Sequence, residues 1–154
     1  MIIEGAQVFA AAPDVVWNFL MDAEVLSRVM PGTRDLRQTG DGQYSGKMAV
    51  KIGPITAAEF VLAIHLSDMD RPRRYVMNVD ANGKLGFTRG VARVTLVPEG
   101  AGTRMDYRAD LQMGGKIASV GQRLLDLVSR TMLKNGMEAL VAEVDRRVAE
   151  GSAS

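Results

Sequence analysis

Apolar and polar residues alternate with a period of two along the middle of the chain, as they do in half-buried strands. The clearest example lies between 104 and 113, where every second residue is apolar and the others are charged or polar. The alternation begins at Thr33, and strands are predicted over 2–11, 43–52, 58–67, 75–80, 89–96 and 104–113. Glycine and proline predict the turns between them, at 39–42, 53–54, 68–74, 82–83 and 98–102.

Two short helices are predicted after the first strand. Pro13 suits the first turn of a helix, because its missing N–H would be unpaired there in any case. Asp22 can cap a second helix, which Pro31-Gly32 ends. Helices this short need a sheet to pack against.

The last third of the chain, 113–149, contains no proline and predicts one long helix. Its first apolar stripe consists of Ile117, Val120, Leu124 and Val128. After Met132 a second stripe follows about half a turn away, formed by Leu133, Met137, Leu140, Val141, Val144 and Val148. Two explanations remain open. Either the helix kinks at Gly136 so that both stripes face one core, or the second stripe packs against another copy in a homodimer.

This order of elements predicts an α+β fold. We expect a curved antiparallel sheet of about seven strands, two short helices after the first strand, and a long C-terminal helix over the sheet. The chain should form a single domain over 1–150, followed by a disordered tail at 151–154. A sheet with one apolar face needs a cover, and the long helix can provide it while enclosing an apolar cavity.

The side chains predicted to face this cavity are apolar, and several are small. Small inward residues leave space that a ligand or larger neighbours must fill. Methionine adapts to ligands of varied shape, although ten methionines could equally form a core without a ligand. The predicted ligand-binding residues are Met48, Val50, Phe60, Leu62, Met77, Val79, Gly90, Ala92, Met105, Tyr107, Ala109, Leu124, Val128 and Met132.

Composition excludes several classes of function. The 154 residues carry a net charge of +1 and 5% aromatic residues, which is no signature of nucleic-acid binding. The absence of cysteine excludes disulfides, thiolate metal sites and a cysteine nucleophile, and a single histidine makes other metal sites unfavourable. Neither a signal peptide nor an apolar run long enough to span a membrane is visible, so we expect a cytoplasmic protein.

Few residues are candidates for chemistry. His65 is the only histidine, but its register places it on the outer face, so we predict no catalytic residue. Tyr44, Tyr75 and Tyr107 face inward, where each could contact a ligand headgroup or simply belong to the core; Tyr107 is the strongest candidate.

Charged residues form three groups whose roles stay open. The alternating charges at 104–110 predict a solvated face with cross-strand pairs, or else a docking surface for a partner. The arginine clusters at 71–74 and 146–147 either keep the surface soluble or touch anionic lipid headgroups.

Short segments spread from residue 1 to 144 match one known family in their order along the chain. They are Ala12-Pro13, Val16-Trp17, Met30-Pro31-Gly32, Lys51-Ile52-Gly53-Pro54-Ile55, Pro72-Arg73-Arg74-Tyr75, Gly102-Thr103-Arg104, Tyr107, Ala109-Asp110 and Gly114-Gly115-Lys116-Ile117-Ala118. In these segments the chain resembles the carbon monoxide dehydrogenase G-subunit (CoxG) family, within the START-like helix-grip (SRPBCC) superfamily.

The resemblance implies an accessory protein of a molybdenum hydroxylase, which links the enzyme to the membrane or assists its assembly. It also implies a helix-grip cavity for a lipid, fatty acid or quinone, with no covalently bound cofactor. Many members carry cysteine where this chain has Thr33. Longer members carry an apolar C-terminal tail that 1–154 does not contain, so we expect only peripheral contact with the inner face of the cell membrane.

Three functional hypotheses follow. The first is this non-enzymatic accessory role with an apolar small-molecule ligand and hydroxylase subunits as partners. The second is a polyketide cyclase or hydratase on the same fold, and the third is an assembly factor without a ligand. The predicted inward positions contain no carboxylate or histidine that could move protons, which favours binding over catalysis.

Overall fold

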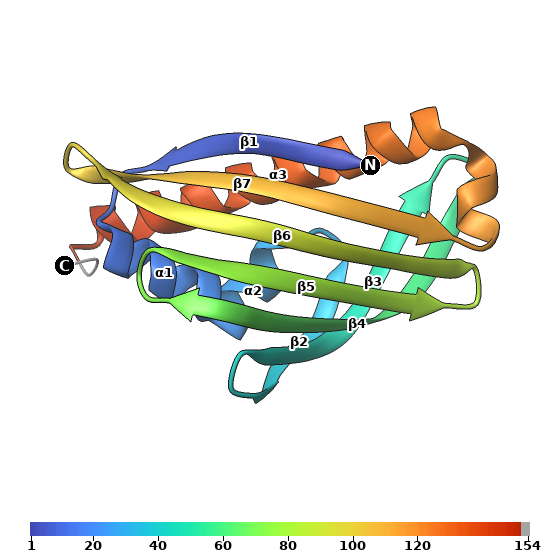
Figure 1. The fold of residues 1–154 in the computed structure, drawn as a ribbon, viewed down its shortest axis with the longest axis horizontal. Helices are drawn as coiled ribbons and strands as arrows, with labels where there is room; N and C mark the ends of the chain where they lie inside the picture. Colours follow the sequence, from blue (N-terminus) through green and yellow to red (C-terminus); the bar gives the residue numbers. More distant parts are fainter. Residues whose placement is uncertain (152–154) are drawn as a thin grey trace.

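The computed structural model describes residues 1–151, with the side chains of Thr56 and Ala57 left out. Seven antiparallel strands form one sheet in the order β1-β7-β6-β5-β4-β3-β2 (Figure 1). The strands are β1 (Ile2–Phe9), β2 (Thr33–Gly40), β3 (Gln43–Ile52), β4 (Ile55–Asp70), β5 (Arg74–Gly83), β6 (Gly86–Glu99) and β7 (Gly102–Gly114). The helices are α1 (Pro13–Met21), α2 (Ala23–Val29), the 3-10 helix η1 (Lys116–Val120) and α3 (Gln122–Ala149).

The predicted α+β architecture is therefore confirmed, including the seven strands, the two short helices and the long C-terminal helix. Pro13 is the first residue of α1, and the Asp22 carboxylate accepts a hydrogen bond from the Glu24 N–H at 2.9 Å at the start of α2. Both helix starts are those that the sequence predicts. Of the predicted tail at 151–154, residues 152–154 lie outside the described part of the chain.

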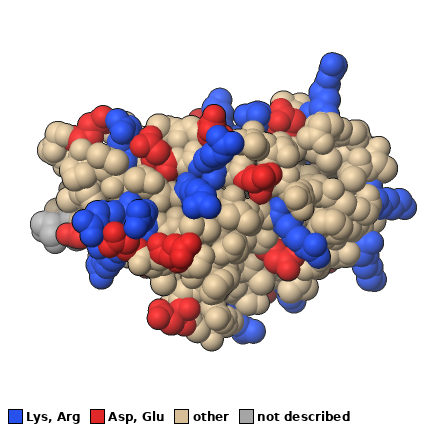
Figure 2. Space-filling view, viewed as in Figure 1, with Lys and Arg blue, Asp and Glu red and all other residues tan. Residues whose placement is uncertain are grey.

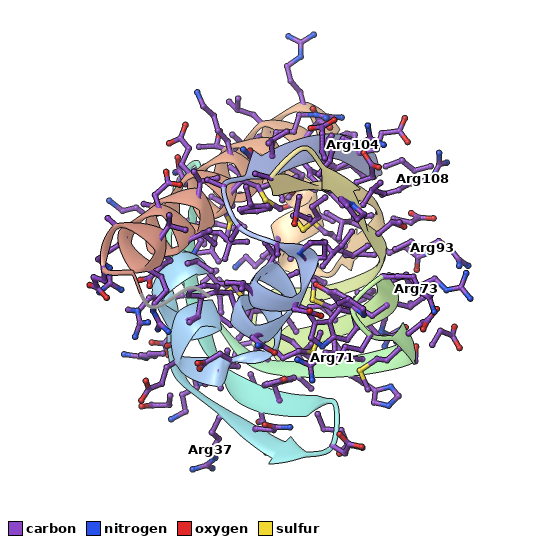
Figure 3. All side chains as sticks on the ribbon, turned by 90° about the vertical axis from the view of Figure 1, so that its left-hand side faces the viewer. Arg37, Arg71, Arg73, Arg93, Arg104 and Arg108 are labelled. Carbon is purple, nitrogen blue, oxygen red and sulfur yellow. The ribbon has the colours of Figure 1, made fainter. Side chains whose placement is uncertain are left out.

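The sheet curves around a core that α3 closes. Viewed end-on, α3 lies on the open side of the curved sheet, between its two margins (Figure 3). It packs against α2, β1 and β3. Helices α1 and α2 cover one end of the sheet, where Trp17 packs edge-to-face on Tyr75 with ring centroids 5.4 Å apart. The helix-grip arrangement implied by the resemblance is thus present.

Several strands are longer than predicted, and their turns are correspondingly shorter. The predicted turn at 82–83 is wrong, because β5 continues to Gly83 and the turn is Lys84-Leu85. A side chain at Gly83 would collide with the Glu59 carbonyl of β4, so glycine is required there for close packing within the sheet. The first strand, by contrast, is shorter than the predicted 2–11, because β1 ends at Phe9.

The long helix begins nine residues later than position 113, where the apolar pattern suggested it. Residues up to Gly114 belong to β7, and Lys116–Val120 form the separate turn η1. Gly115 and Gly121 on either side of η1 have φ values of 79° and 100°, which glycine adopts without strain. Ile117 is buried, and its N–H donates to the Leu85 carbonyl at 2.8 Å, which ties η1 to the β5–β6 turn.

Most of the second apolar stripe of α3 is covered within the same chain, while Val148 is 40% exposed. Leu140 and Val144 are fully buried, and Met137 and Val141 pack against the core. Helix α3 continues through Gly136 without interruption, with that glycine close to the Val29 carbonyl of α2. The stripe shifts because the first half of α3 lies beside β3 and the second half lies beside α2. A second copy is not needed to cover Leu140 and Val144.

Candidate ligand-binding site

The concave face of the sheet is covered unevenly. The inward side chains of β4 are fully buried: Ala58, Phe60, Leu62, Ile64 and Leu66. On β5, β6 and β7, by contrast, a contiguous group points inward by register but remains only partly buried. This group, which we call the open inner face, consists of Met77, Val79, Ala92, Tyr107, Ala109, Leu111 and Met113.

Small side chains and incomplete helix cover explain why this face stays open. Ala92 lies opposite Ala109 on the neighbouring strand, so two short side chains meet at its centre. In the first half of α3 only Leu125 is fully buried, and Leu127 is 61% exposed. The inner side chains of β5–β7 are therefore less completely covered than those of β4.

The predicted ligand-binding residues fall into three places. Met77, Val79, Ala92, Tyr107 and Ala109 belong to the open inner face. A second set is half-buried where α3 passes β3: Met48, Val50, Leu124, Val128 and Met132. The rest are fully buried and so belong to the closed core: Phe60, Leu62, Gly90 and Met105.

Two members of the open inner face are missing from the predicted set. Leu111 and Met113 continue the same alternation as Ala109 on β7, so the pattern could have identified both. Leu133 and Met137 of α3 were also not assigned to the site, because the shift between the two helical stripes obscured which face they share.

Two grooves flank α3. One, of about 330 Å³, separates α3 from β3 and is mostly apolar. Its lining residues are Pro31, Gly32, Ala49, Val50, Lys51, Leu127, Val128, Thr131 and Met132. The other, of about 310 Å³, separates α3 from β1 and has a mixed polar and apolar lining. We call the latter the β1 groove; it is lined by Ile3, Glu4, Gln7, Tyr107, Arg130, Leu133, Lys134, Met137 and Glu138.

The three inward tyrosines have different roles. The Tyr44 hydroxyl donates to the Met21 carbonyl at 2.6 Å, and burial raises the pKa of this hydroxyl. Tyr75 is buried beside Trp17, and burial raises its pKa strongly. Both residues are therefore structural. Of the three tyrosines, Tyr107 lines the groove between α3 and β1, and its contact with a ligand stays a prediction.

Charged side chains cover the outer face of the sheet. His65 is exposed there, as its register predicts. Arg108 contacts Glu4 at 3.1 Å and Arg104 contacts Asp106 at 3.3 Å, so the alternating charges of β7 form surface ion pairs. Arg93, Arg104 and Arg108 project away from the sheet (Figure 3), and acidic and basic side chains are interspersed over this side (Figure 2).

An ion pair connects α2 to α3 behind the core. Arg28 donates to Glu143 at 2.9 Å, and Arg146 reaches the same carboxylate at 2.7 Å. The hydrogen bond from Arg28, followed by that from Arg146, lowers the pKa of Glu143. The Glu143 side chain is only 13% exposed, so this contact is shielded more than the surface pairs of the sheet.

Neither a metal-binding cluster nor a membrane-spanning helix is seen in residues 1–151. No group of three or more histidine and carboxylate side chains is gathered in this part of the chain. No helix within it is long and apolar enough to cross a bilayer.

The structure is similar to several solved proteins over nearly its whole length. A conserved protein from Geobacillus kaustophilus superposes with a TM-score of 0.88 at 24% identity, covering 96% of this chain and 97% of that one. The Zhui aromatase/cyclase from Streptomyces sp. R1128 gives 0.71 at 17% identity, covering 96% and 95%. Protein CV1439 from Chromobacterium violaceum gives 0.69 at 13% identity, covering 93% and 96%. At these identities the similarity shows a shared fold.

The fold and the partly covered inner face of its sheet together define a protein of the helix-grip class. Within that class, the family model of the carbon monoxide dehydrogenase G-subunit (CoxG) matches residues 5–145. The chain belongs to this family. No curated protein matches it in sequence.

Proposed function

We propose that this protein is a non-enzymatic accessory protein of a molybdenum hydroxylase, which it assists in membrane recruitment or assembly while holding an apolar ligand such as a lipid or quinone. Membership of the CoxG family over residues 5–145 is the observation that carries this proposal. The open inner face supports the ligand, because its apolar side chains point inward and yet keep part of their surface uncovered.

Binding is favoured over catalysis by the chemistry of the inner face. General acid–base catalysis requires a carboxylate, histidine or similar group within hydrogen-bond reach of the reacting atoms. The inward positions of β3–β7 whose side chains are described carry apolar residues, glycine, threonine and tyrosine. The fold similarity to an aromatase/cyclase keeps an enzyme as the alternative, and turnover of an aromatic polyketide analogue would favour it.

Native mass spectrometry of the purified protein tests the ligand. We expect an added mass that disappears on denaturation and an apolar molecule in the organic extract. If the protein is consistently empty and takes up no added lipid or quinone, the ligand part of the proposal is wrong.

The partner is tested separately with a purified molybdenum hydroxylase of the carbon monoxide dehydrogenase type. We expect the two proteins to migrate together in size-exclusion chromatography at micromolar concentration. Independent migration across that range, with or without vesicles, would contradict the accessory role.

A further inference from the structure

The β1 groove is amphipathic, with an apolar floor and hydrogen-bond donors along its rim. Ile3, Leu133 and Met137 provide apolar surface, and Ile3 is 4% exposed. Arg130 and Lys134 lie one helical turn apart on the side of α3 that faces β1. Such a lining suits a molecule with an apolar body and one polar end.

Tyr107 connects this groove to the interior. It lies opposite Gly5 on β1, and a Cβ built at Gly5 would fall 2.6 Å from the tyrosine hydroxyl oxygen. The absence of a side chain at Gly5 therefore lets the tyrosine extend across β1 toward the groove. On the same strand Ala109 is the next inward residue, so Tyr107 belongs both to the groove lining and to the open inner face.

Two donors at this rim have no partner within residues 1–151. The Tyr107 hydroxyl makes no hydrogen bond to another described residue, and the Lys134 ammonium makes no ion pair with one. Arg130 is already engaged, at 2.9 Å with Asp126 and at 3.4 Å with the Ile2 carbonyl. The groove thus offers one hydroxyl and one ammonium group to a bound molecule.

Two acidic residues, Glu4 and Glu138, also line the groove. Glu4 is paired with Arg108 on the outer face of the sheet. Glu138 is exposed one turn beyond Lys134, and the Gln7 amide donates to the Val8 carbonyl. Because Arg130 is paired with Asp126 and Glu4 with Arg108, Lys134 and Glu138 are the charged lining residues that make no ion pair within residues 1–151.

We propose that the β1 groove binds the carboxylate of a fatty-acid-like amphiphile, whose alkyl chain passes under α3 onto the open inner face. This inference rests on the proposed ligand-binding function and specifies the head of the ligand and where it lies. A carboxylate has two acceptor oxygens, which match the Lys134 ammonium and the Tyr107 hydroxyl. A neutral alcohol in the same place would lose the charge-assisted hydrogen bond to Lys134.

The test uses displacement of the neutral fluorescent probe N-phenyl-1-naphthylamine by laurate and by dodecanol, which have the same chain length and different heads. We expect laurate to displace the probe at about tenfold lower concentration than dodecanol at pH 7.4. Lys134→Gln should weaken the binding of laurate about tenfold, and Tyr107→Phe should weaken it about fivefold. The binding of dodecanol should be unchanged in both variants. Lys47→Gln, an exposed residue of β3, is the matched charge control and should leave laurate binding unchanged.

The outcomes separate this inference from the function on which it rests. Probe affinity that is equal in all variants shows that they are folded with an intact apolar site. If laurate and dodecanol then displace the probe at equal concentrations, or if Lys134→Gln does not change the affinity for laurate, the proposed carboxylate site is wrong. The proposed apolar cavity stands in that case. If neither the probe nor laurate binds the unmodified protein, both the inference and the ligand-binding function are overturned.

Discussion

Two buried threonine hydroxyls differ in whether they have a hydrogen-bond partner. The Thr103 Oγ1 donates to the Ala11 carbonyl at 2.6 Å, and the residue is completely buried. The Thr33 Oγ1 is buried as well, but it has no hydrogen-bond partner among the described residues. A buried hydroxyl without a partner costs free energy, whereas a paired one contributes to stability. The same substitution should therefore have opposite effects at the two positions.

Thr103→Val should lower the free energy of unfolding by about 1–3 kcal/mol, because it leaves the Ala11 carbonyl unpaired. Thr33→Val should raise it by about 1 kcal/mol, since it removes the unpaired hydroxyl. Urea titration followed by circular dichroism measures both, with Thr95→Val on the exposed face of β6 as the control. Loss of stability in Thr33→Val would mean that its hydroxyl is paired after all.

Single residues also show where sequence reasoning succeeds and where it stops. Alternation correctly placed His65 outside the sheet and Tyr107 inside it, because the side-chain period of a strand is fixed. It could not separate Phe60, which is 5% exposed, from Met77, which is only partly buried. Register gives the face on which a side chain lies, whereas its degree of cover depends on where α3 crosses.

At the scale of elements, the turns and the last helix depart most from expectation. The Asn82-Gly83 dipeptide predicted a turn two residues before the observed one at 84–85, because Gly83 instead allows close packing against β4. The apolar residues Ile117 and Val120 fit a helical stripe and nevertheless belong to η1, which Gly121 separates from α3. Local patterns predicted which elements exist, and contacts between distant strands decided where they end.

The attachment of α3 to α2 depends on a contact that no local pattern reveals. Arg28 and Glu143 are 115 positions apart in the sequence and meet only because both helices pack on the same end of the core. Because Arg28 lowers the folded-state pKa of Glu143, the contact stabilises the protein above the ordinary carboxyl value of 4.5 and is lost as pH falls through the lower folded-state value.

Glu143→Gln should therefore reduce the free energy of unfolding by about 1 kcal/mol at pH 7. The difference from the unmodified protein should shrink as the pH falls from 4.5 through the lower folded-state pKa of Glu143, where the native carboxylate also becomes protonated. Urea titrations between pH 3 and pH 7 measure this, with Glu138→Gln on the same helix as the control. A difference that stays constant over this range would show that the Glu143 charge does not contribute.

At the scale of the whole molecule, one end of the core is closed and the middle is not. The α1 and α2 end is packed with large buried side chains, while the open inner face carries Ala92, Ala109 and other partly covered residues. Under the proposed function, this division places the residues that stabilise the fold in one region and those that bind the ligand in another. Side chains added to the open inner face should therefore affect binding more than folding.

Ala109→Leu fills the centre of the open inner face and tests the central claim most directly. Ala63→Leu is the matched control, since Ala63 is exposed on the outer face of β4. Both variants and the unmodified protein would be incubated with laurate and examined by native mass spectrometry, with thermal unfolding as the check of folding. We predict that the bound mass is retained in Ala63→Leu and lost in Ala109→Leu, with both variants folded. Equal retention in the two folded variants would contradict an apolar ligand between the sheet and α3.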